Sequence, residues 1–308
     1  MVATTLDAGR PTDPVALFEA HRAELIRQKL AANIVFAALF FGLLGWSIVV
    51  SRFYPDRLAA GLPRIFEYFG TVMPNLEWDK LLAERGADGR AVPGSLRFWY
   101  ADFNKYVGLI FETILMAISA TILGTFFAFI LSFPAARNLA PHPVVGVICR
   151  RLLEVFRSIP EILIALVLVF AVGIGPLAGV IAVAVASAGG LGKLFSEVAE
   201  NCSMRPVDGI RSVGGTWFQE IRYGVVPQIL PNYASYTLLR FEINVRASSI
   251  VGFVGAGGIG SEINHVISFF SDDRVTAVLI LVVLTVTAID LLSDRVRGYF
   301  IGKENLRA

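Results

Sequence analysis

Cysteine, histidine and charged residues are all scarce in this sequence of 308 residues. Its two cysteines, Cys149 and Cys202, match no Cys-x-x-Cys spacing, and its three histidines are isolated from one another. Disulfide frameworks and metal sites need such residues at short, regular spacings, so we expect no disulfide framework and no metal site. Charged residues make up only 17% of the chain, whereas about 25% is usual in a soluble globular domain. Net charge is +2 and the basic residues are scattered, which excludes a nucleic-acid-binding surface.

Hydrophobic residues are correspondingly abundant, at 55% of the chain, and the mean hydropathy is +0.65. They gather in runs of about 20 residues, the length that crosses the hydrocarbon core of a bilayer. A soluble enzyme is therefore excluded. The sequence predicts an all-α polytopic membrane protein with six transmembrane helices, over residues 30–50, 106–133, 144–172, 177–195, 233–254 and 275–292.

Three of the predicted spans contain unusual residues. Glu112 is the one charge in the second span, and the third contains Pro160, which we expect as a kink. The fifth carries Arg240, Glu242 and Arg246. Charges at bilayer depth are expensive, so these three residues mark the fifth span as a candidate functional element.

The distribution of lysine and arginine predicts the orientation. About four such residues occupy each of the N-terminus, the segment after the second span, the segment between spans four and five, and the C-terminus. Basic segments of this kind stay in the cytoplasm, so both termini are predicted to be cytoplasmic. The predicted organisation is a cytoplasmic amphipathic N-terminal segment 1–29, a first span 30–50, a periplasmic insert 51–105, a transmembrane core 106–298 and a cytoplasmic tail 299–308.

The loop between spans four and five, residues 197–228, has the pattern of two short amphipathic helices joined by a glycine turn. Apolar residues precede Gly214–Gly215, and others, including Trp217 and Ile221, follow it. Exposed apolar side chains of this kind need a cover, which lipid or a partner protein could supply. The residues alone leave both interpretations open.

A family resemblance favours the partner protein. Asp208-Gly-Ile, Gly214 and Gly224-Val-Val-Pro resemble the cytoplasmic Glu-Ala-Ala…Gly…Ile-x-Leu-Pro loop of importer permeases of the ATP-binding-cassette (ABC) class. In that family the loop forms the coupling helix, which sits in a groove of the ATPase subunit. The present sequence departs from the motif at Asp208, Gly209, Ile210, Gly224 and Val226. By this resemblance, coupling to the ATPase is assigned to Asp208, Gly209, Ile210, Gly214, Gly215, Trp217 and Pro227.

Further segments resemble phosphonate importer permeases and their relatives for phosphite, from about Glu112 to Gly298, roughly 60% of the chain. They are Arg157-Ser-Ile-Pro-Glu, Ala171-Val-Gly-Ile-Gly-Pro, Ser187-Ala-Gly-Gly-Leu-Gly-Lys-Leu-Phe, Arg222-Tyr-Gly-Val-Val-Pro-Gln and the stretch from Glu242 to Gly260. The resemblance implies the type I ABC importer permease (MetI-like) fold in the bacterial inner membrane. It implies translocation of phosphonates, phosphite or phosphate esters.

The same resemblance implies the partners. They are two copies of an ABC ATPase that binds ATP and magnesium, a periplasmic solute-binding protein, and a second permease copy, most simply in a homodimer. The chain itself is then not an enzyme, with no catalytic residue and no cofactor of its own.

Glu242 and Arg246 stand at i and i+4 within the fifth span, the favourable order for an ion pair on one helix. One interpretation is a structural pair that neutralises both charges. The other is a translocation pathway formed by Glu242, Arg246, Ser248 and Ser249, in which the guanidinium suits phosphonate oxygens. Both remain open.

Gly255-Ala-Gly-Gly-Ile-Gly matches the dinucleotide-binding string but has no βαβ context, so we assign Gly255, Gly257, Gly258 and Gly260 to a gate or to helix packing. Gly189-Gly-Leu-Gly-Lys resembles a phosphate-binding loop, but such a loop has a Ser or Thr after the lysine to bind Mg²⁺. This sequence has Leu194 at that position. Energy must then come from a partner subunit.

Two other classes of protein were weighed. A secondary transporter usually shows internal repeats, and none relates residues 30–150 to 150–300. A membrane-embedded enzyme would need a nucleophile–base pair, a histidine cluster or paired carboxylates in the spans, which the sequence lacks. An ABC importer permease for another small solute remains the main alternative.

Overall fold

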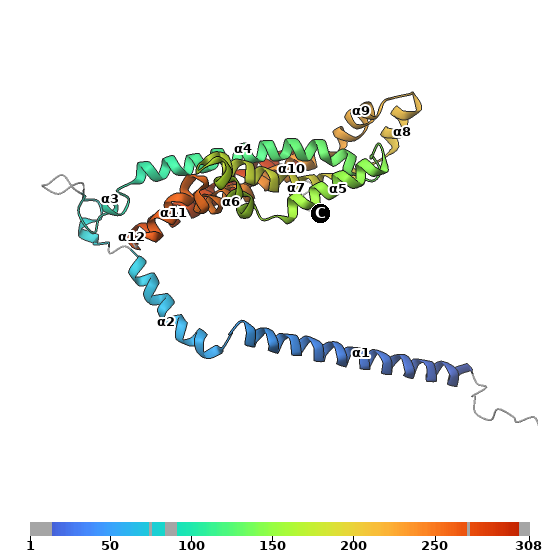
Figure 1. Ribbon diagram of the computed structural model, residues 1–308, viewed down its shortest axis with the longest axis horizontal. Helices are drawn as coiled ribbons and strands as arrows, with labels where there is room; N and C mark the ends of the chain where they lie inside the picture. The colour runs from blue at the N-terminus through green and yellow to red at the C-terminus, as the bar shows by residue number, and fades with distance from the viewer. Residues whose placement is uncertain (1–13, 74–75, 84–90, 270–271, 302–308) are drawn as a thin grey trace, which may run out of the picture. The chain divides into compact units, whose positions relative to one another are not determined.

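The computed structural model describes residues 14–73, 76–83, 91–269 and 272–301, and every regular element in those ranges is helical (Figure 1). The chain divides after Gly70 into two compact units. Parts of four predicted segments lie outside the described residues: 1–13 of the N-terminal segment, 74–75 and 84–90 of the insert, 270–271 of the core, and 302–308 of the tail.

The first unit consists of α1 (Pro14–Val50) and most of α2 (Pro55–Val72). α1 is one continuous helix, so the predicted amphipathic segment and the first span are not separate elements. Its stretch Leu17–Val50 is long and apolar enough to cross a membrane. α2 carries Pro63 inside the helix.

The second unit is a helical bundle. Its elements are η1 (Trp78–Lys80), α3 (Leu96–Trp99), α4 (Phe103–Ala135), α5 (Pro143–Ser158), α6 (Glu161–Val172), α7 (Pro176–Glu200), α8 (Arg205–Ser212), α9 (Trp217–Gln219), the π-helical η2 (Glu220–Val225), α10 (Val226–Val251), the π-helical η3 (Gly252–Ala256), α11 (Gly258–Ser268) and α12 (Asp272–Ile301). Within the described residues, four helices could cross a membrane, or up to six if each of two bent helix pairs is one span. The upper count agrees with the predicted number of spans.

The third predicted span is not one kinked helix, as the sequence suggested. α5 and α6 meet at 86°, because Ile159 and Pro160 both leave the helical conformation (ψ 120° and 135°). Proline removes a backbone donor and disfavours helix at the residue before it, so the two residues form a break rather than a kink.

The bounds of the fifth span and of the predicted loop also need correction. α10 begins at Val226, seven residues before the predicted start of the span, and runs on from α9 and η2 without a break. At its other end the chain bends by 58° before α11. α7 continues to Glu200, so the segment between helices begins later than residue 197.

Small residues let α4 and α7 pack closely. Ala120, Gly124 and Ala128 recur every fourth residue along α4 and are all buried. A Cβ atom at Gly124 would stand 2.5 Å from the Cβ of Ser187 on α7. Close backbone approach through small side chains is the usual basis of helix association in lipid.

An aromatic cluster anchors α10 to α7 at the end of the bundle that holds α8. The rings of Phe195 and Tyr233 stack with centroids 3.8 Å apart, and the Tyr233 hydroxyl donates to the Phe195 carbonyl at 2.8 Å. Val207 of α8 and Val225 of η2 belong to the same buried cluster. The loop is therefore fixed to the core by its own apolar residues.

Candidate functional sites

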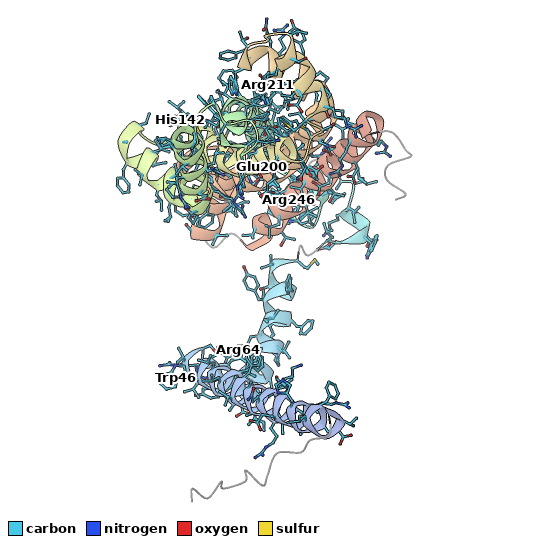
Figure 2. The ribbon with its side chains drawn as sticks, turned by 90° about the vertical axis from the view of Figure 1, so that its right-hand side faces the viewer. Trp46, Arg64, His142, Glu200, Arg211 and Arg246 are labelled. Atoms are coloured by element: carbon cyan, nitrogen blue, oxygen red, sulfur yellow. The ribbon has the colours of Figure 1, made fainter. Side chains whose placement is uncertain are left out.

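The predicted coupling loop lies at one end of the bundle, where Figure 1 shows α8 and α9 beyond the end of α4. The α4–α5 connection reaches the same end, because the Arg137 backbone N–H donates to the Glu200 carboxylate at 2.9 Å. The indole nitrogen of Trp217 donates to the Leu139 carbonyl at 2.7 Å. Figure 2 looks onto this end, with His142 and Arg211 labelled. Three separate segments thus form one surface.

An ion pair closes the loop on itself. Arg211 of α8 donates from Nε and Nη2 to the two carboxylate oxygens of Glu220, at 3.1 and 2.9 Å. This fork raises the pKa of Arg211 above its ordinary value, first through the hydrogen bond and then through the charge of Glu220. Asp208, the residue at the motif's glutamate position, lies 3.8 Å from Arg211. The fork holds α8 against the start of the α10 helix.

The glycines of the loop differ in what they require. Gly214 has φ +81°, a conformation that L side chains rarely adopt, with open space around it. A Cβ at Gly215 would stand 2.4 Å from the Ile210 side chain, and one at Gly224 would stand 3.0 Å from Val207. Gly209 has open space and an ordinary φ. Gly214 and Gly215 therefore shape the turn, whereas Gly209 does not need to be glycine.

The expected exposure of the loop's apolar residues was partly wrong. Ile221 is only 7% exposed and Trp217 is half-buried, because the core of this same chain covers them. The most exposed large apolar side chains of the loop are instead Val213 and Phe218, at 84% and 76%. Pro227 is exposed near the start of α10. A partner would meet Val213 and Phe218 first.

Two charges of the fifth span, Glu242 and Arg246, pair with α12 and not with each other. Arg246 donates to Asp290 at 2.7 Å, and Glu242 lies 3.8 Å from Arg297. The intrahelical Glu242–Arg246 pair considered from the sequence is therefore wrong. The side chain of Arg246 is 48% exposed and lies beside α12 (Figure 2), whereas that of Glu242 is only 12% exposed.

The two serines of the predicted pathway are less accessible than Arg246. Ser248 is buried, and its hydroxyl has no hydrogen-bond partner in the structure. Ser249 bonds to the Val245 carbonyl of its own helix at 3.2 Å. Asp290 also keeps one buried carboxylate oxygen without a hydrogen-bond partner. Of the four residues predicted to line a pathway, Arg246 presents the most exposed side chain.

A buried polar network at the centre of the bundle was missed from the sequence. Asn244 of α10 is fully buried, donates to Thr121 of α4 at 2.8 Å and accepts from Ser187 of α7 at 3.0 Å. Arg240 in turn donates to the Ser187 hydroxyl at 3.0 Å. The available signal was an asparagine inside an apolar span, which must find partners in lipid. The network joins the three central helices.

The glycine string lies at the break between α10 and α11. Gly255, Gly257 and Gly258 all have positive φ, at +97°, +83° and +66°. A Cβ at Gly260 would stand 1.9 Å from the Ser249 carbonyl oxygen, so only glycine fits there.

Two backbone N–H groups in the first turn of α11 have no partner within their own helix and donate to side chains of α4. Glu112 accepts from the Gly258 N–H at 3.3 Å, and Thr113 accepts from the Ile259 N–H at 2.9 Å. Glu112, the one charge of the second predicted span, thus caps α11 and stabilises the bend between α10 and α11.

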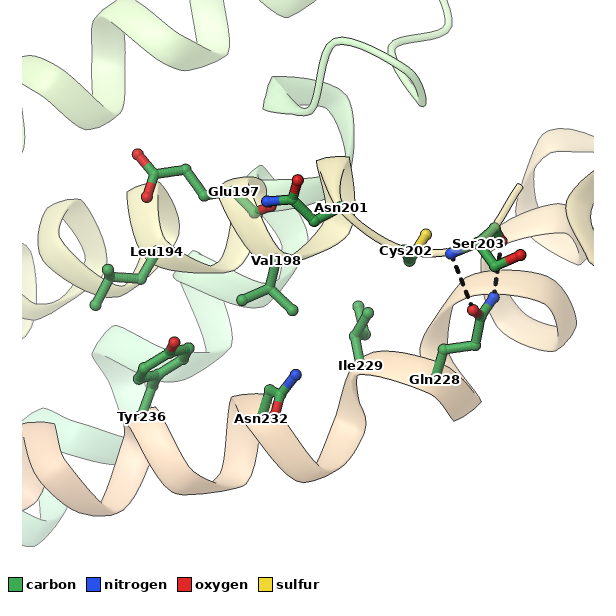
Figure 3. A pocket seen from close by; sticks show the side chains of 10 residues that line it. All are labelled: Leu194, Glu197, Val198, Asn201, Cys202, Ser203, Gln228, Ile229, Asn232 and Tyr236. Carbon is green, nitrogen blue, oxygen red and sulfur yellow. Dashed lines mark hydrogen bonds between the residues drawn. The ribbon is translucent and has the colours of Figure 1, made fainter. Parts of the chain in front are cut away.

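A polar pocket of about 460 Å³ separates α7 from α10 near the loop (Figure 3). Gln228 spans its edge, donating to the Ser203 carbonyl and accepting from the Ser203 N–H, both at 3.1 Å. Glu197, Asn201 and Asn232 also line it. No Lys or Arg of the described residues lines this pocket, so it offers no cation to an anionic ligand.

Comparison with known proteins now adds to this geometry. Residues 124–303 match the family model described as "binding-protein-dependent transport system inner membrane component". The chain is 36% identical over 212 residues to the phosphite transport system permease protein PtxC of Stutzerimonas stutzeri, covering 69% of this chain and 76% of that protein. It is 46% identical over 113 residues to the putative cryptic phosphonate transport system permease protein PhnE2 of Escherichia coli K12, covering 37% of this chain and 93% of that protein.

Among solved structures, a chain of the MetNI methionine ABC transporter in an inward-facing conformation has a similar fold. The TM-score is 0.55 at 21% identity, over 63% of this chain and 95% of that one. The all-α, type I ABC importer permease fold predicted from the sequence is confirmed.

Proposed function

Because the chain belongs to the family of binding-protein-dependent transport system inner membrane components, we propose that it is the permease of an ATP-driven importer for phosphonate-type anions. It is a non-catalytic transmembrane subunit of the inner membrane. The phosphite and phosphonate permeases it resembles support phosphonates, phosphite or phosphate esters as the substrate class.

The observation that carries the substrate class is Arg246. An arginine at membrane depth costs at least about 2.5–3.5 kcal/mol, so such a residue is a candidate for a functional role. Its guanidinium is half-exposed and offers a planar fork of donors, which matches a phosphoryl oxyanion. In the structure Asp290 pairs with it at 2.7 Å and neutralises its charge. Substrate oxygens would then replace carboxylate oxygens on the same donors.

The loop of α8 and α9 is the proposed contact with the ATPase. The exposed Val213 and Phe218 supply an apolar surface, and the Arg211–Glu220 fork makes the loop rigid enough to transmit a displacement. ATP and Mg²⁺ bind to the ATPase, and the permease binds no cofactor. Its other proposed coupling residues are Asp208, Gly209, Ile210, Gly214, Gly215, Trp217 and Pro227.

The proposed assembly contains two permease copies as a homodimer, two ATPase copies and a periplasmic solute-binding protein. The loop end of the bundle faces the cytoplasm, as do both termini, and the insert 51–105 faces the periplasm. The basic residues of the loop end, among them Arg137, Arg205 and Arg222, support this orientation.

The alternative is an importer permease of the same family for another small solute. Growth tests distinguish this alternative from the proposal. The cells used lack their own importers for phosphorus anions and carry this chain together with its ATPase and binding protein. Growth on methylphosphonate or phosphite as the only phosphorus source supports the proposal, provided that the host can metabolise both. Failure on both, with the complex assembled in the membrane, would contradict it.

A further inference from the structure

We propose that a basic pocket at the loop end of the bundle binds the headgroup of an anionic phospholipid. The basic pocket lies between the α4–α5 connection, α5 and α7, and has a volume of about 560 Å³. Its charged lining residues are Arg137, Arg150, Arg151, Glu154 and Lys193. None of these residues is part of the pathway or coupling loop proposed above.

The charges of the basic pocket are unbalanced. Four cationic side chains and one carboxylate line it. Arg151 pairs with that carboxylate, Glu154, at 2.5 Å, and Lys193 pairs with Glu197, outside the lining, at 3.5 Å. No acidic side chain within the described residues forms an ion pair with the guanidinium of Arg137 or Arg150. The Arg150 Nε donates only to the Gly146 carbonyl, at 3.1 Å. Arg137 and Arg150 therefore keep most of their donors for a ligand, and a phosphate group suits both.

α5 places an apolar stripe directly beside these charges. The helix has a buried face toward α7, where Gly192 of α7 closely approaches Leu153, and Leu153 is 1% exposed. Val144, Ile148 and Val155 lie on another face and are 57%, 60% and 52% exposed. At 100° per residue, Arg151 lies next to this stripe. A ligand with one anionic end and a long apolar part fits the pocket and the stripe together.

The position of the pocket selects a lipid over a free oxyanion. The pocket opens where α4 ends and α5 begins, and it includes Lys193 near the end of α7. Both α4 and α7 are candidate membrane spans, so their ends lie at the depth of lipid headgroups. A basic pocket between helices at this depth, bordered by an exposed apolar stripe, is typical of sites for anionic headgroups. A free phosphate would gain nothing from the stripe.

The test is native mass spectrometry of the full chain purified with its ATPase from membranes that contain phosphatidylethanolamine, phosphatidylglycerol and cardiolipin. The test variant is Arg137→Gln with Arg150→Gln. The matched control is Arg57→Gln with Arg64→Gln, which removes the same charge from exposed positions of α2. A third variant, Arg137→Lys with Arg150→Lys, changes the same two positions but keeps the charge. If it keeps the lipid, then substitution at these positions does not by itself disrupt the fold, and the loss in the glutamine variant reflects the lost charge.

We expect the test variant to retain about tenfold less phosphatidylglycerol or cardiolipin than the control, because two headgroup contacts are lost. The lysine variant should keep most of the lipid. Retention equal to the control would overturn the proposal. If the wild-type protein carries no phospholipid and binds inorganic phosphate at millimolar concentration, the pocket is a site for a free oxyanion. That result would also overturn the proposal. Neither result bears on the transported substrate, which the growth tests address.

Discussion

Arg246 is the residue on which the proposed substrate class depends. Its sequence context identified it as unusual, because a charge in an apolar span needs a partner or an aqueous surface. The sequence could not identify that partner. Asp290 lies on a helix far along the chain, and only the packing of α10 against α12 brings the two groups to 2.7 Å.

A role of Arg246 in substrate binding and a purely structural role predict different uptake when its charge and that of Asp290 are removed together. Arg246→Ala should abolish uptake with normal assembly, and Arg246→Lys should recover part of it, because an ammonium replaces a fork of donors. The double variant Arg246→Gln with Asp290→Asn removes both charges, so it should keep normal abundance and still lack uptake. Membrane protein level and phosphonate uptake are measured together, with Arg295→Ala as control. Full uptake by the double variant would make the pair purely structural.

Asn244 gives a prediction about stability. Asn244→Val leaves the hydroxyls of Ser187 and Thr121 without their central partner, at a cost of about 1–3 kcal/mol. We expect a lower melting temperature of the purified complex in detergent. Thr237→Val is the control, since its hydroxyl bonds only to the Tyr233 carbonyl of its own helix. An unchanged melting temperature for Asn244→Val would show that the network adds nothing to stability.

At the scale of elements, hydropathy predicted which segments are helical, and local backbone chemistry determined where they break. The sequence shows Pro160, which predicts a disturbance of the helix. Whether the disturbance is a kink or an 86° break depends on whether Ile159 also leaves the helical conformation, and the sequence does not show that. The burial of Ile221 was not predictable, because the residues that bury it come from α4, α7 and α10. The glycine turn at Gly214 was predictable, because it depends on local sequence alone.

The loop prediction concerns Gly214. Gly214→Glu adds a charge to the exposed turn and forces an unfavourable φ, so we expect normal insertion with loss of transport and of stimulated ATP hydrolysis. Gly214→Asn is the matched control, because asparagine tolerates positive φ and carries no charge. Insertion, uptake and ATPase rate are measured for both. Normal uptake by Gly214→Glu would exclude the loop as the coupling element.

At the scale of the molecule, the sequence predicted the fold class and the number of spans through composition and the length of apolar runs. The family match and the similar fold in a methionine ABC transporter agree with the predicted fold class, and the predicted six spans equal the upper count for the described residues. The path of a solute could not be predicted in the same way, because in the proposed homodimer it depends on surfaces that face the second copy. Sequence periodicity carries no information about that pairing.

The predicted orientation is tested with cysteines in a background where Cys149 and Cys202 are replaced by serine. Leu82→Cys, 83% exposed in the insert, should react with a membrane-impermeant thiol reagent added to cells whose outer membrane has been permeabilised. Val213→Cys, 84% exposed in the loop, should react only after the inner membrane is opened. The reverse pattern would place the loop away from any cytoplasmic ATPase.

The central claim is that this chain couples ATP hydrolysis to the import of a phosphorus oxyanion. The most direct measurement is uptake of radiolabelled methylphosphonate or phosphite into proteoliposomes that contain the purified permease and ATPase, with binding protein outside and ATP inside. We predict uptake that needs both ATP and binding protein and that Arg246→Ala abolishes. Uptake that continues without ATP, or that Arg246→Ala leaves unchanged, would contradict the account.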